Sequence, residues 1–236
     1  MSAFSGPEIP NSGLVLHLDA ANPKSYSGSG TTWFDLSGNG NNGTLINGPT
    51  YSTANGGSIM FDGVDDYISF ITPDALSFNT FSYQCWFKPT FNTAGFDTLF
   101  SRENARHYLG YTDSGQYQIF LRGNLFAING QFESPVGNTN IVTASAWQHV
   151  HLNIDWSSST FSLYHNCVLV WSLTNSLLGT TFINNLSADA TIGSRYAGST
   201  SNKFLGDISN FIYYNRILSV AEIQKNFEAT RDRYGI

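Results

Sequence analysis

The chain has 236 residues, of which 41% are hydrophobic, 15% aromatic and only 12% charged, and its formal net charge is −6. The apolar content excludes a disordered chain. The acidic balance argues against a nucleic acid partner, because a phosphate backbone is bound by clustered Lys and Arg. No apolar run reaches the roughly 20 residues of a membrane-spanning helix, so membrane insertion is not expected.

Residues 1–12 contain Pro7 and Pro10 and predict a flexible lead-in. They lack the basic and apolar regions of a secretory signal. No linker or internal repeat divides the remainder, so we expect a single domain over residues 13–236.

Hydrophobic residues alternate with polar ones along most of the chain, which is typical of strands with one face on a core. Residues 79–88, 147–156 and 159–165 show this pattern, and turn signals such as Asn-Gly and Asp-Gly separate the runs. Many short strands with regular turns predict an all-β protein, a two-sheet antiparallel sandwich or a barrel. The side chains expected in the core are Phe81, Tyr83, Cys85, Phe87, Val150, Leu152, Ile154, Trp156, Phe161 and Leu163.

One segment near the C-terminus has the pattern of a short helix. Ser219 is followed three residues later by Glu222, which is the spacing of a capping box. Val220, Ile223 and Phe227 then form a short apolar stripe. We therefore expect one short C-terminal helix.

Cys85 and Cys167 are the only cysteines, and each lies within an apolar strand pattern. Two buried free thiols are the preferred interpretation, and a single disulfide is the alternative. The redox compartment therefore stays open. Two cysteines do not supply the spacing of a metal site.

The loop 38–43 reads GNGNNG and matches the glycine pattern of dinucleotide-binding proteins. That pattern requires a helix directly after the glycines, because the pyrophosphate lies on the helix N-terminus. Thr44 and Ile46 are β-branched and Pro49 follows closely, so no helix is expected there. We therefore reject a nucleotide site.

The same loop has two other interpretations. Asp35, Ser37 and Asn39 place oxygen atoms at alternate positions, as in the first half of a calcium loop, and Gly40 permits the bend. Ile46 occupies the position of the bidentate Glu of an EF-hand, so a bound ion would need ligands from elsewhere. The alternative is an Asx-type turn satisfied by its own backbone.

Six stretches, taken in order, resemble the laminin-G-like, concanavalin A-like lectin and glucanase jelly-roll superfamily. The resemblance extends over about residues 12–230 and implies two stacked antiparallel sheets of six or seven strands each. Members are mostly carbohydrate- or protein-binding modules, often with a structural Ca²⁺. The stretches are residues 13–20, 35–45, 61–67, 147–150, the strand–turn–strand around Asn166, and residues 204–223.

The topology implied by the resemblance makes Asp19, Asp62 or Asp207 the carboxylates nearest to the loop that contains Asp35 and Asn39. Asp35, Asn39, Asp62 and Asp207 are the predicted ligands of a structural Ca²⁺, which binds carboxylate and amide oxygens. The acidic patch around Asp62 has a tight turn as its alternative interpretation.

Sugar recognition uses flat aromatic rings against the apolar face of a sugar and fork-like amide or guanidinium groups for its hydroxyls. Residues of these types occur on the polar face of the predicted sheets and on loops at its rim. Their alternative interpretation is polar sheet-face residues that contact no ligand. The predicted ligand-binding residues are Trp86, Arg122, His151, Tyr164 and Tyr196.

Glycan-cleaving branches of the superfamily carry alternate carboxylates in a strand motif Glu-x-Asp-x-Glu, because a retaining hydrolase needs two carboxyl groups about 5 Å apart. No glutamate here lies two or four residues from another acid on a predicted strand, and no Ser or Cys has the surroundings of a nucleophile. We therefore expect no catalytic activity. The glutamates are Glu8, Glu103, Glu133, Glu222 and Glu228.

The sequences GLVLHLDAANPKSY and SGNGNNGT resemble virion proteins of tailed bacteriophages. This resemblance implies a non-catalytic binding or adhesion module that contacts host-surface glycan, as capsid decoration or as part of a tail or fibre, and that is assembled in the host cytoplasm. A purely structural virion subunit without a ligand is the alternative function, and a glycan-cleaving enzyme, for which spacing does not exclude a Tyr nucleophile with an Arg triad, is the less favoured one. A secreted or cell-surface protein is the alternative location. The expected partners are host glycan, other virion proteins and further copies of the chain.

Overall fold

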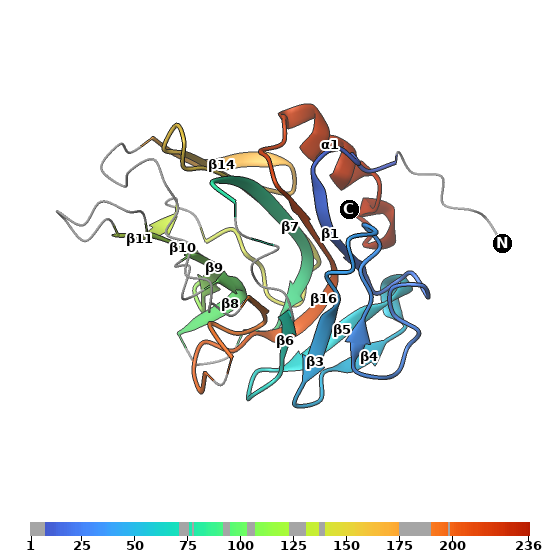
Figure 1. Ribbon diagram of the computed structural model, residues 1–236. Coiled ribbons are helices and arrows are strands. Elements are labelled where there is room, and N and C mark those ends of the chain that lie inside the picture. Colours follow the sequence, from blue (N-terminus) through green and yellow to red (C-terminus); the bar gives the residue numbers. More distant parts are fainter. Residues whose placement is uncertain are drawn as a thin grey trace.

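The computed structural model describes residues 8–70, 76, 78–91, 95–102, 107–122, 131–136, 140–174, 190–197 and 199–236. These residues form two antiparallel sheets that pack face to face, with one α-helix near the C-terminus (Figure 1). The predicted all-β, two-sheet jelly roll with a short C-terminal helix is confirmed.

Sheet 1 has the strand order β14-β13-β12-β7-β16-β5-β4, and β1 pairs with β16 beside this path. Sheet 2 has the order β11-β10-β9-β8-β15-β6-β3-β2. The strands of sheet 1 are β1 (Leu14–Asp19), β4 (Thr50–Ser52), β5 (Ser58–Asp62), β7 (Thr80–Pro89), β12 (Gln148–Asp155), β13 (Thr160–His165), β14 (Val168–Thr174) and β16 (Leu205–Tyr214). The strands of sheet 2 are β2 (Thr32–Trp33), β3 (Gly43–Ile46), β6 (Tyr67–Phe70), β8 (Phe96–Arg102), β9 (His107–Thr112), β10 (Tyr117–Arg122), β11 (Gln131–Val136) and β15 (Thr191–Ile192).

Each sheet has eight strands among the described residues, more than the six or seven that the resemblance implies. The difference comes from short or peripheral strands. β2 and β15 have two residues each, and β1 pairs only with β16. A two-residue strand is too short to show the alternation by which strands are predicted.

The core lies between the two sheets, and the alternating apolar residues of β7 and β12 face it as predicted. Aromatic rings make up much of its centre. Tyr83 stacks on Tyr213 with ring centroids 6.0 Å apart and contacts Phe100 at 4.8 Å. The predicted core residues found there are Phe81, Tyr83, Cys85, Phe87, Val150, Leu152, Ile154, Trp156, Phe161 and Leu163.

The two cysteines pack into different apolar clusters. Cys85 is buried in the core between the sheets, whereas Cys167 is half-buried and packs against the apolar residues beneath the C-terminal segment. Both are free thiols, as the preferred interpretation predicted, but only Cys85 is fully buried.

Helix α1 (Val220–Glu228) begins at the predicted capping box. The Ser219 hydroxyl accepts a hydrogen bond from the Glu222 backbone N–H at 3.4 Å, and the Glu222 carboxylate accepts one from the Ser219 N–H at 2.9 Å. Arg216 adds a bidentate ion pair, with Nη2 2.6 Å from Glu222 Oε1. The hydrogen bonds from Arg216 and from the Ser219 backbone lower the pKa of Glu222 to about 2. The position at which the helix begins is thereby fixed.

Helix α1 and the short 3-10 helix η5 (Arg231–Arg233) cover part of the outer face of sheet 1, the face turned away from the core (Figure 1). Trp86 lies at the centre of this contact. Its ring stacks on Tyr234 with centroids 4.2 Å apart and on Phe227 at 5.3 Å. Its Nε1 donates a hydrogen bond of 2.8 Å to Thr230 Oγ1. The C-terminal segment, residues 219–236, is therefore a third layer packed on sheet 1.

Two polar side chains on the outer face of sheet 1 form hydrogen bonds with the part of the chain that covers this face. Asn226 donates from Nδ2 to Gln84 Oε1 at 2.9 Å. Asn153 exchanges two hydrogen bonds of 3.0 Å with the backbone of Leu218. Because buried amides require such partners, Gln84 and Asn153 belong to a packed interface.

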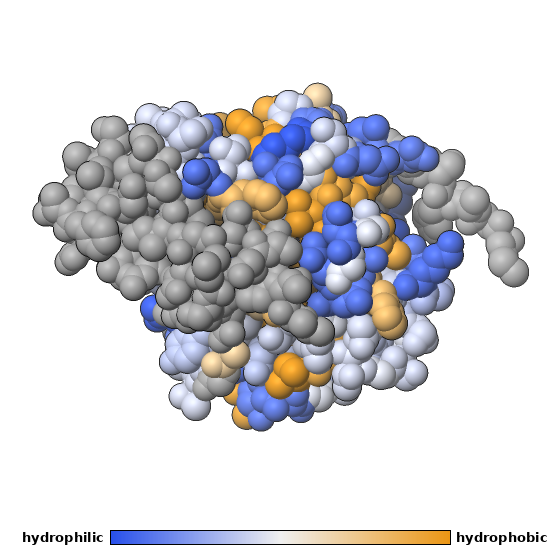
Figure 2. All heavy atoms as spheres, viewed as in Figure 1, coloured by the Kyte–Doolittle hydropathy of each residue, from blue (hydrophilic) through white to orange (hydrophobic). Residues whose placement is uncertain are grey.

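The surface contains both hydrophilic and hydrophobic patches (Figure 2). Large exposed apolar side chains include Val168 and Leu169 on the edge strand β14 and Val220 at the start of α1. In the part of the chain that the structure describes, no helix is long and apolar enough to cross a membrane.

We expect Trp86→Ala to lower the free energy of unfolding by roughly 3–5 kcal/mol, the usual cost of truncating a buried tryptophan. The variant loses the stacking on Tyr234 and Phe227 and leaves the Thr230 hydroxyl without its donor. Urea unfolding followed by circular dichroism measures the change. Phe34→Ala is the control, because Phe34 is 50% exposed. A similar loss in both variants would contradict the central role of Trp86.

Candidate functional site

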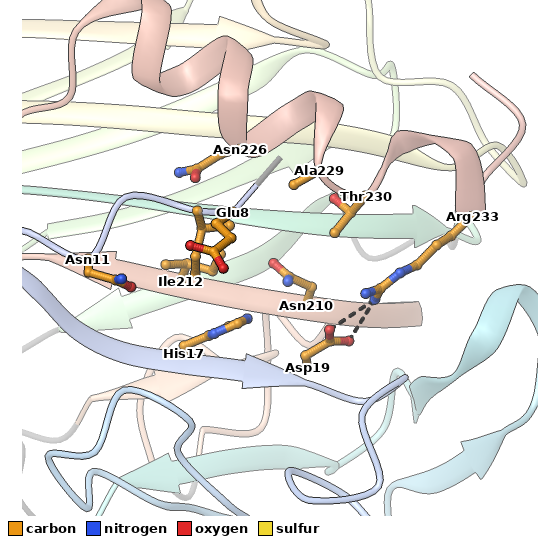
Figure 3. Close-up of a pocket in the computed structure, with 11 residues that line it drawn as sticks. Glu8, Asn11, His17, Asp19, Asn210, Ile212, Asn226, Ala229, Thr230 and Arg233 are labelled. Atoms are coloured by element: carbon orange, nitrogen blue, oxygen red, sulfur yellow. Dashed lines mark hydrogen bonds and ion pairs between the residues drawn. The ribbon is translucent and has the colours of Figure 1, made fainter. Parts of the chain in front are cut away.

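Two cavities of about 380 and 360 Å³ lie beside the C-terminal segment, the first of them on the outer face of sheet 1. Arg233 lines both cavities and forms the boundary between them. The first, which we call the β1 pocket, is lined by Glu8, Ile9, Asn11, His17, Asp19, Asn210, Ile212, Asn226, Ala229, Thr230 and Arg233 (Figure 3). The second, which we call the Asn55 pocket, is lined by Ala21, Asn55, Gly56, Asp232 and Arg233.

The polar floor of the β1 pocket follows from strand alternation. Leu16 and Leu18 of β1 face the core, so His17 and Asp19 face outward. The antiparallel register places Asp19 opposite Asn210 of β16. Two polar side chains from strands at opposite ends of the sequence therefore lie side by side in the floor of the pocket.

An ion pair between Asp19 and Arg233 joins this floor to the C-terminal segment. Nη1 of Arg233 donates to both carboxylate oxygens of Asp19, at 2.9 and 3.0 Å. The backbone N–H of Ala21 donates to Asp19 Oδ1 at 3.0 Å. The Asp19 side chain is 7% exposed and that of Arg233 25%. The pair therefore holds a guanidinium group at the boundary of the two cavities.

Asn210 is only 1% exposed, yet its Oδ1 has no hydrogen-bond partner among the described residues. Buried side-chain oxygens are nearly always paired, and an orphaned one costs about 1–3 kcal/mol. Figure 3 shows this side chain between β1 and the C-terminal segment, within the ring of residues that line the pocket. A donor on a water or on another bound molecule would satisfy this oxygen.

The other polar groups of the pocket come from β1 and from the residues that precede it. Burial lowers the pKa of His17, and the carboxylates of Asp19 and Asp35 only partly oppose this shift. The imidazole of His17 is therefore neutral at neutral pH and has one donor and one acceptor nitrogen. Glu8 and Asn11 add a carboxylate and an amide.

The structure separates the predicted ligand-binding residues. Trp86 and His151 are fully buried and Tyr164 is 9% exposed, because the C-terminal segment packs over this face. The prediction that these three residues lie on a sheet face open to a ligand is wrong. Tyr196 is 43% exposed on the loop after β15 but lines neither cavity. The side chain of Arg122 lies outside the described residues.

Asp35 and Asn39 form the Asx-type turn that was the alternative to a calcium loop. Asp35 Oδ1 accepts hydrogen bonds from the backbone N–H groups of His17 at 2.9 Å and Ser37 at 2.8 Å. Asp35 Oδ2 accepts from the N–H of Asn41 at 3.0 Å. The amide of Asn39 donates to backbone carbonyls of β1. These contacts occupy the oxygens of Asp35 with donors of the protein itself.

The glycines of GNGNNG serve the bend of the same loop. Gly38 and Gly40 have φ values of +87° and +75°, in the left-handed region that favours glycine. The residues that follow form strand β3 and not the helix that a dinucleotide site requires. The loop is therefore a tight connection between β2 and β3.

The four predicted calcium ligands do not converge on one point. Asp207 accepts a hydrogen bond of 2.8 Å from Ser58 Oγ and pairs with Lys88 Nζ at 3.0 Å. Asp35 is engaged by its own loop, and the carboxylates that meet Asp62 are those of its sequence neighbours. The four-residue site predicted from the resemblance is therefore not formed.

Asp62, Asp65 and Asp66 bring carboxylate oxygens within 4.8 Å of one another in the turn between β5 and β6. Burial raises the pKa of Asp66, and the nearby ammonium group of Lys203 opposes this rise. Lys203 is itself buried, and its Nζ donates to the carbonyl of Asp65 at 3.2 Å. Lys203 thus supplies positive charge at the place where a calcium ion would supply it.

We expect EDTA to leave the melting temperature of the wild-type protein unchanged, because Lys203 already offsets the charge of the acidic turn. Lys203→Met should lower the melting temperature, and millimolar Ca²⁺ should restore part of the loss by neutralising the exposed carboxylates. Calorimetry with and without EDTA measures both effects. Lys24→Met, at an exposed position, is the control. A drop in the wild-type melting temperature with EDTA would indicate a bound divalent ion and contradict this account.

Besides His17, four histidines of the fold are wholly or largely buried and have low pKa values. Burial lowers the pKa of His107 to about 3 and those of His151 and His165 to about 4. Burial also lowers the pKa of His149 well below its usual range, and both of its ring nitrogens lack a partner among the described residues. In the unfolded chain each of these groups titrates near pH 6.5.

We expect the protein to lose stability as the pH falls from about 6.5 toward 4. In this window the unfolded chain binds protons on these histidines and the folded protein does not, so stability rises with pH by about 1.4 kcal/mol per pH unit for each such group. Urea unfolding at a series of pH values measures the slope. His149→Phe should reduce the slope by one such contribution. A free energy of unfolding that stays constant over this window would contradict the prediction.

Of the residues that build the β1 pocket, sequence reasoning named only Asp19 as a site candidate, as an additional calcium ligand, and missed the others. Alternation along β1 does indicate that His17 and Asp19 face away from the core, but β16 has a register shift between Ile208 and Asn210 that hides the outward position of Asn210. Alternation does not indicate that β1 pairs with β16, which brings them together. No pattern in the sequence identifies Arg233 as a partner of Asp19.

The two sheets, their strand order and the short C-terminal helix define a lectin-like jelly-roll sandwich of the concanavalin A type. The sequence profile described as the concanavalin A-like lectin/glucanases superfamily matches residues 62–224, more than half of the chain. The chain therefore belongs to this superfamily, and the resemblance seen in its motifs is confirmed at that level.

Solved structures with this fold include binding domains and parts of enzymes. Domain 4 of an extracellular arabinanase from Geobacillus stearothermophilus, in complex with arabinotriose, has a TM-score of 0.66 and 19% identity, covering 91% of this chain and 98% of that domain. The binding domain of Paraclostridial Mosquitocidal Protein 1 has a TM-score of 0.71 and 17% identity, covering 91% of this chain and 52% of that one.

A sialidase of Trypanosoma rangeli, in complex with sialic acid, has a TM-score of 0.67 and 17% identity. The match covers 97% of this chain but only 35% of the sialidase. At these identities the likeness shows the fold alone. No curated protein sequence matches the chain.

Proposed function

We propose that this protein is a non-catalytic glycan-binding module and that the glycan binds in the β1 pocket. The observation that carries the proposal is the buried, unpaired Oδ1 of Asn210 in a wall that also holds the neutral imidazole of His17 and the guanidinium of Arg233. Such groups recognise sugar hydroxyls, which both donate and accept hydrogen bonds. A volume of about 380 Å³ lies within the range of small-molecule sites.

The pocket is built largely on rigid elements. His17, Asp19 and Asn210 lie on paired strands, and Thr230 is held by its hydrogen bond to Trp86. Side chains that are fixed before a ligand arrives lose little conformational entropy on binding. This preorganisation favours selective binding of a polar ligand.

The similar structures support a binding role. The arabinanase domain was solved with arabinotriose, and the mosquitocidal relative is a binding domain. Extending a sugar ligand from those proteins to this chain is part of the proposal.

We further place this module in the virion of a tailed bacteriophage, where it contacts host-surface glycan as capsid decoration or as part of a tail or fibre. The support is the resemblance carried by residues 13–26 and 37–44. An antibody against the chain is then expected to label purified phage particles. Labelled particles with no glycan binding would favour a purely structural subunit, and unlabelled particles would contradict the virion placement.

A glycan-cleaving activity has less support from this pocket. Of its carboxylates, Asp19 is engaged by Arg233 and by the backbone N–H of Ala21, which leaves Glu8. A glycosidase of the usual kind needs one carboxyl group as acid and another as base or nucleophile. Release of reducing sugar that is abolished by Asp19→Asn would replace the binding proposal with an enzymatic one.

A glycan array, followed by isothermal titration of the best ligand, tests the binding proposal. We expect Arg233→Ala to weaken binding about tenfold or more, because a hydrogen bond from a charged group is lost. Arg231→Ala is the matched control, since it removes the same charge from the same turn. Arg231 lines neither cavity and pairs with Glu228 at 2.7 Å.

Two outcomes would contradict this prediction. If both folded variants bind as well as the wild type, the ligand binds elsewhere. If the wild-type protein binds no glycan on the array, the proposed function itself is wrong.

A further inference from the structure

The two cavities carry an excess of negative charge. Their charged residues are Glu8, Asp19 and Asp232 against Arg233 alone. Asp19 already neutralises Arg233, so one further carboxylate remains in each cavity. Asp232 has the guanidinium of Arg231 at 4.0 Å, whereas no described residue forms a hydrogen bond or ion pair with the carboxylate of Glu8. The uncompensated charge of the β1 pocket is therefore at Glu8.

Several donors of the β1 pocket are already in use. Nδ2 of Asn226 donates to Gln84 Oε1 at 2.9 Å and to the Tyr214 hydroxyl at 3.3 Å, which occupies both of its hydrogens. Nη1 of Arg233 donates to Asp19. These contacts hold the C-terminal segment on the sheet, and they leave Asn226 without a donor for a ligand but use only one nitrogen of the Arg233 guanidinium.

The acceptors of the pocket are less fully used. Oδ1 of Asn210 has no partner although the residue is buried, and the Glu8 carboxylate has none among the described residues. Glu8 and Asn210 both line the β1 pocket (Figure 3). A complementary ligand therefore brings hydrogen-bond donors and positive charge.

We propose that the glycan bound in the β1 pocket carries a protonated amino group, such as a hexosamine unit without its N-acetyl group, and that the ammonium is bound by the Glu8 carboxylate and Asn210 Oδ1. This inference rests on the proposed glycan-binding function. An ammonium group has three donors and no acceptor, which matches the two unused acceptors. An N-acetyl group has one N–H and no charge, and a hydroxyl leaves the charge of Glu8 uncompensated.

The test uses three tetrasaccharides with the same β-1,4 linkage that differ only at C2: glucosamine, N-acetylglucosamine and glucose tetramers. Isothermal titration with the full chain at slightly acidic pH should show the glucosamine tetramer binding about tenfold or more tightly than the other two, as expected for a charge-assisted hydrogen bond. Tetralysine, which carries the same ammonium groups on a peptide, serves as a competitor. It should displace the glucosamine tetramer only weakly.

Two variants locate the ammonium group. Glu8→Gln keeps the size of an exposed side chain and should bring the three tetramers to within about threefold of one another, because the preference is a charge effect. Asn210→Ala should reduce the preference as well, with its melting temperature measured to confirm folding. Glu228→Gln is the matched control, since it removes one acidic charge outside both cavities and should keep the full preference.

The outcomes distinguish this inference from the function on which it rests. Equal or tighter binding of the N-acetylated or glucose tetramer would overturn the amino-group inference and leave glycan binding intact. So would a preference that survives Glu8→Gln, or failure of the glucosamine tetramer to bind while other glycans do. Equal displacement by tetralysine would show recognition of an ammonium that is not specific to a glycan and would also overturn it. If no glycan of any kind binds, both proposals are wrong.

Discussion

The packing of the C-terminal segment against Trp86 is the interaction on which the outer face of this protein depends. Helix α1 has nine residues, too few to be stable in water by its own hydrogen bonds. Its place is set by the stacking of Phe227 and Tyr234 on Trp86 and by the hydrogen bond from Trp86 to Thr230. The same segment supplies Arg233, so the β1 pocket loses one wall whenever this contact is lost.

This contact also explains why the polar outer face of sheet 1 packs against the C-terminal segment of the same chain. A polar side chain that alternates with core residues faces either water or a partner that satisfies it. Gln84 finds that partner in Asn226, which is 142 residues away in the sequence. Asn153 finds one in the backbone at Leu218. The match is incomplete at Asn210 and at His149, and of these two residues only Asn210 lines the β1 pocket.

Local sequence patterns correctly predicted the core faces of two strands and the start of the helix. The β1 pocket and the covering of sheet 1 depend instead on contacts between residues far apart in the sequence. The alternation in β7 and β12 placed their core residues, and the Ser219–Glu222 spacing placed the helix start. The pocket depends on an ion pair between Asp19 and Arg233, which are 214 residues apart. No periodicity links two such positions. For the same reason the sequence predicts an open face for Trp86, because nothing in its own strand indicates the segment that covers it.

The Asp19–Arg233 pair connects the stability of the C-terminal segment to the choice of ligand. An anionic ligand would compete with Asp19 for Arg233, and separating a largely buried pair leaves a charge without its partner, which is more costly than the pair is favourable. It would also loosen the turn that carries Tyr234. An ammonium group bound by Glu8 and Asn210, as proposed above, would leave the pair intact. The Asp19–Arg233 pair, which helps to hold the C-terminal segment on sheet 1, therefore disfavours negative charge in the β1 pocket.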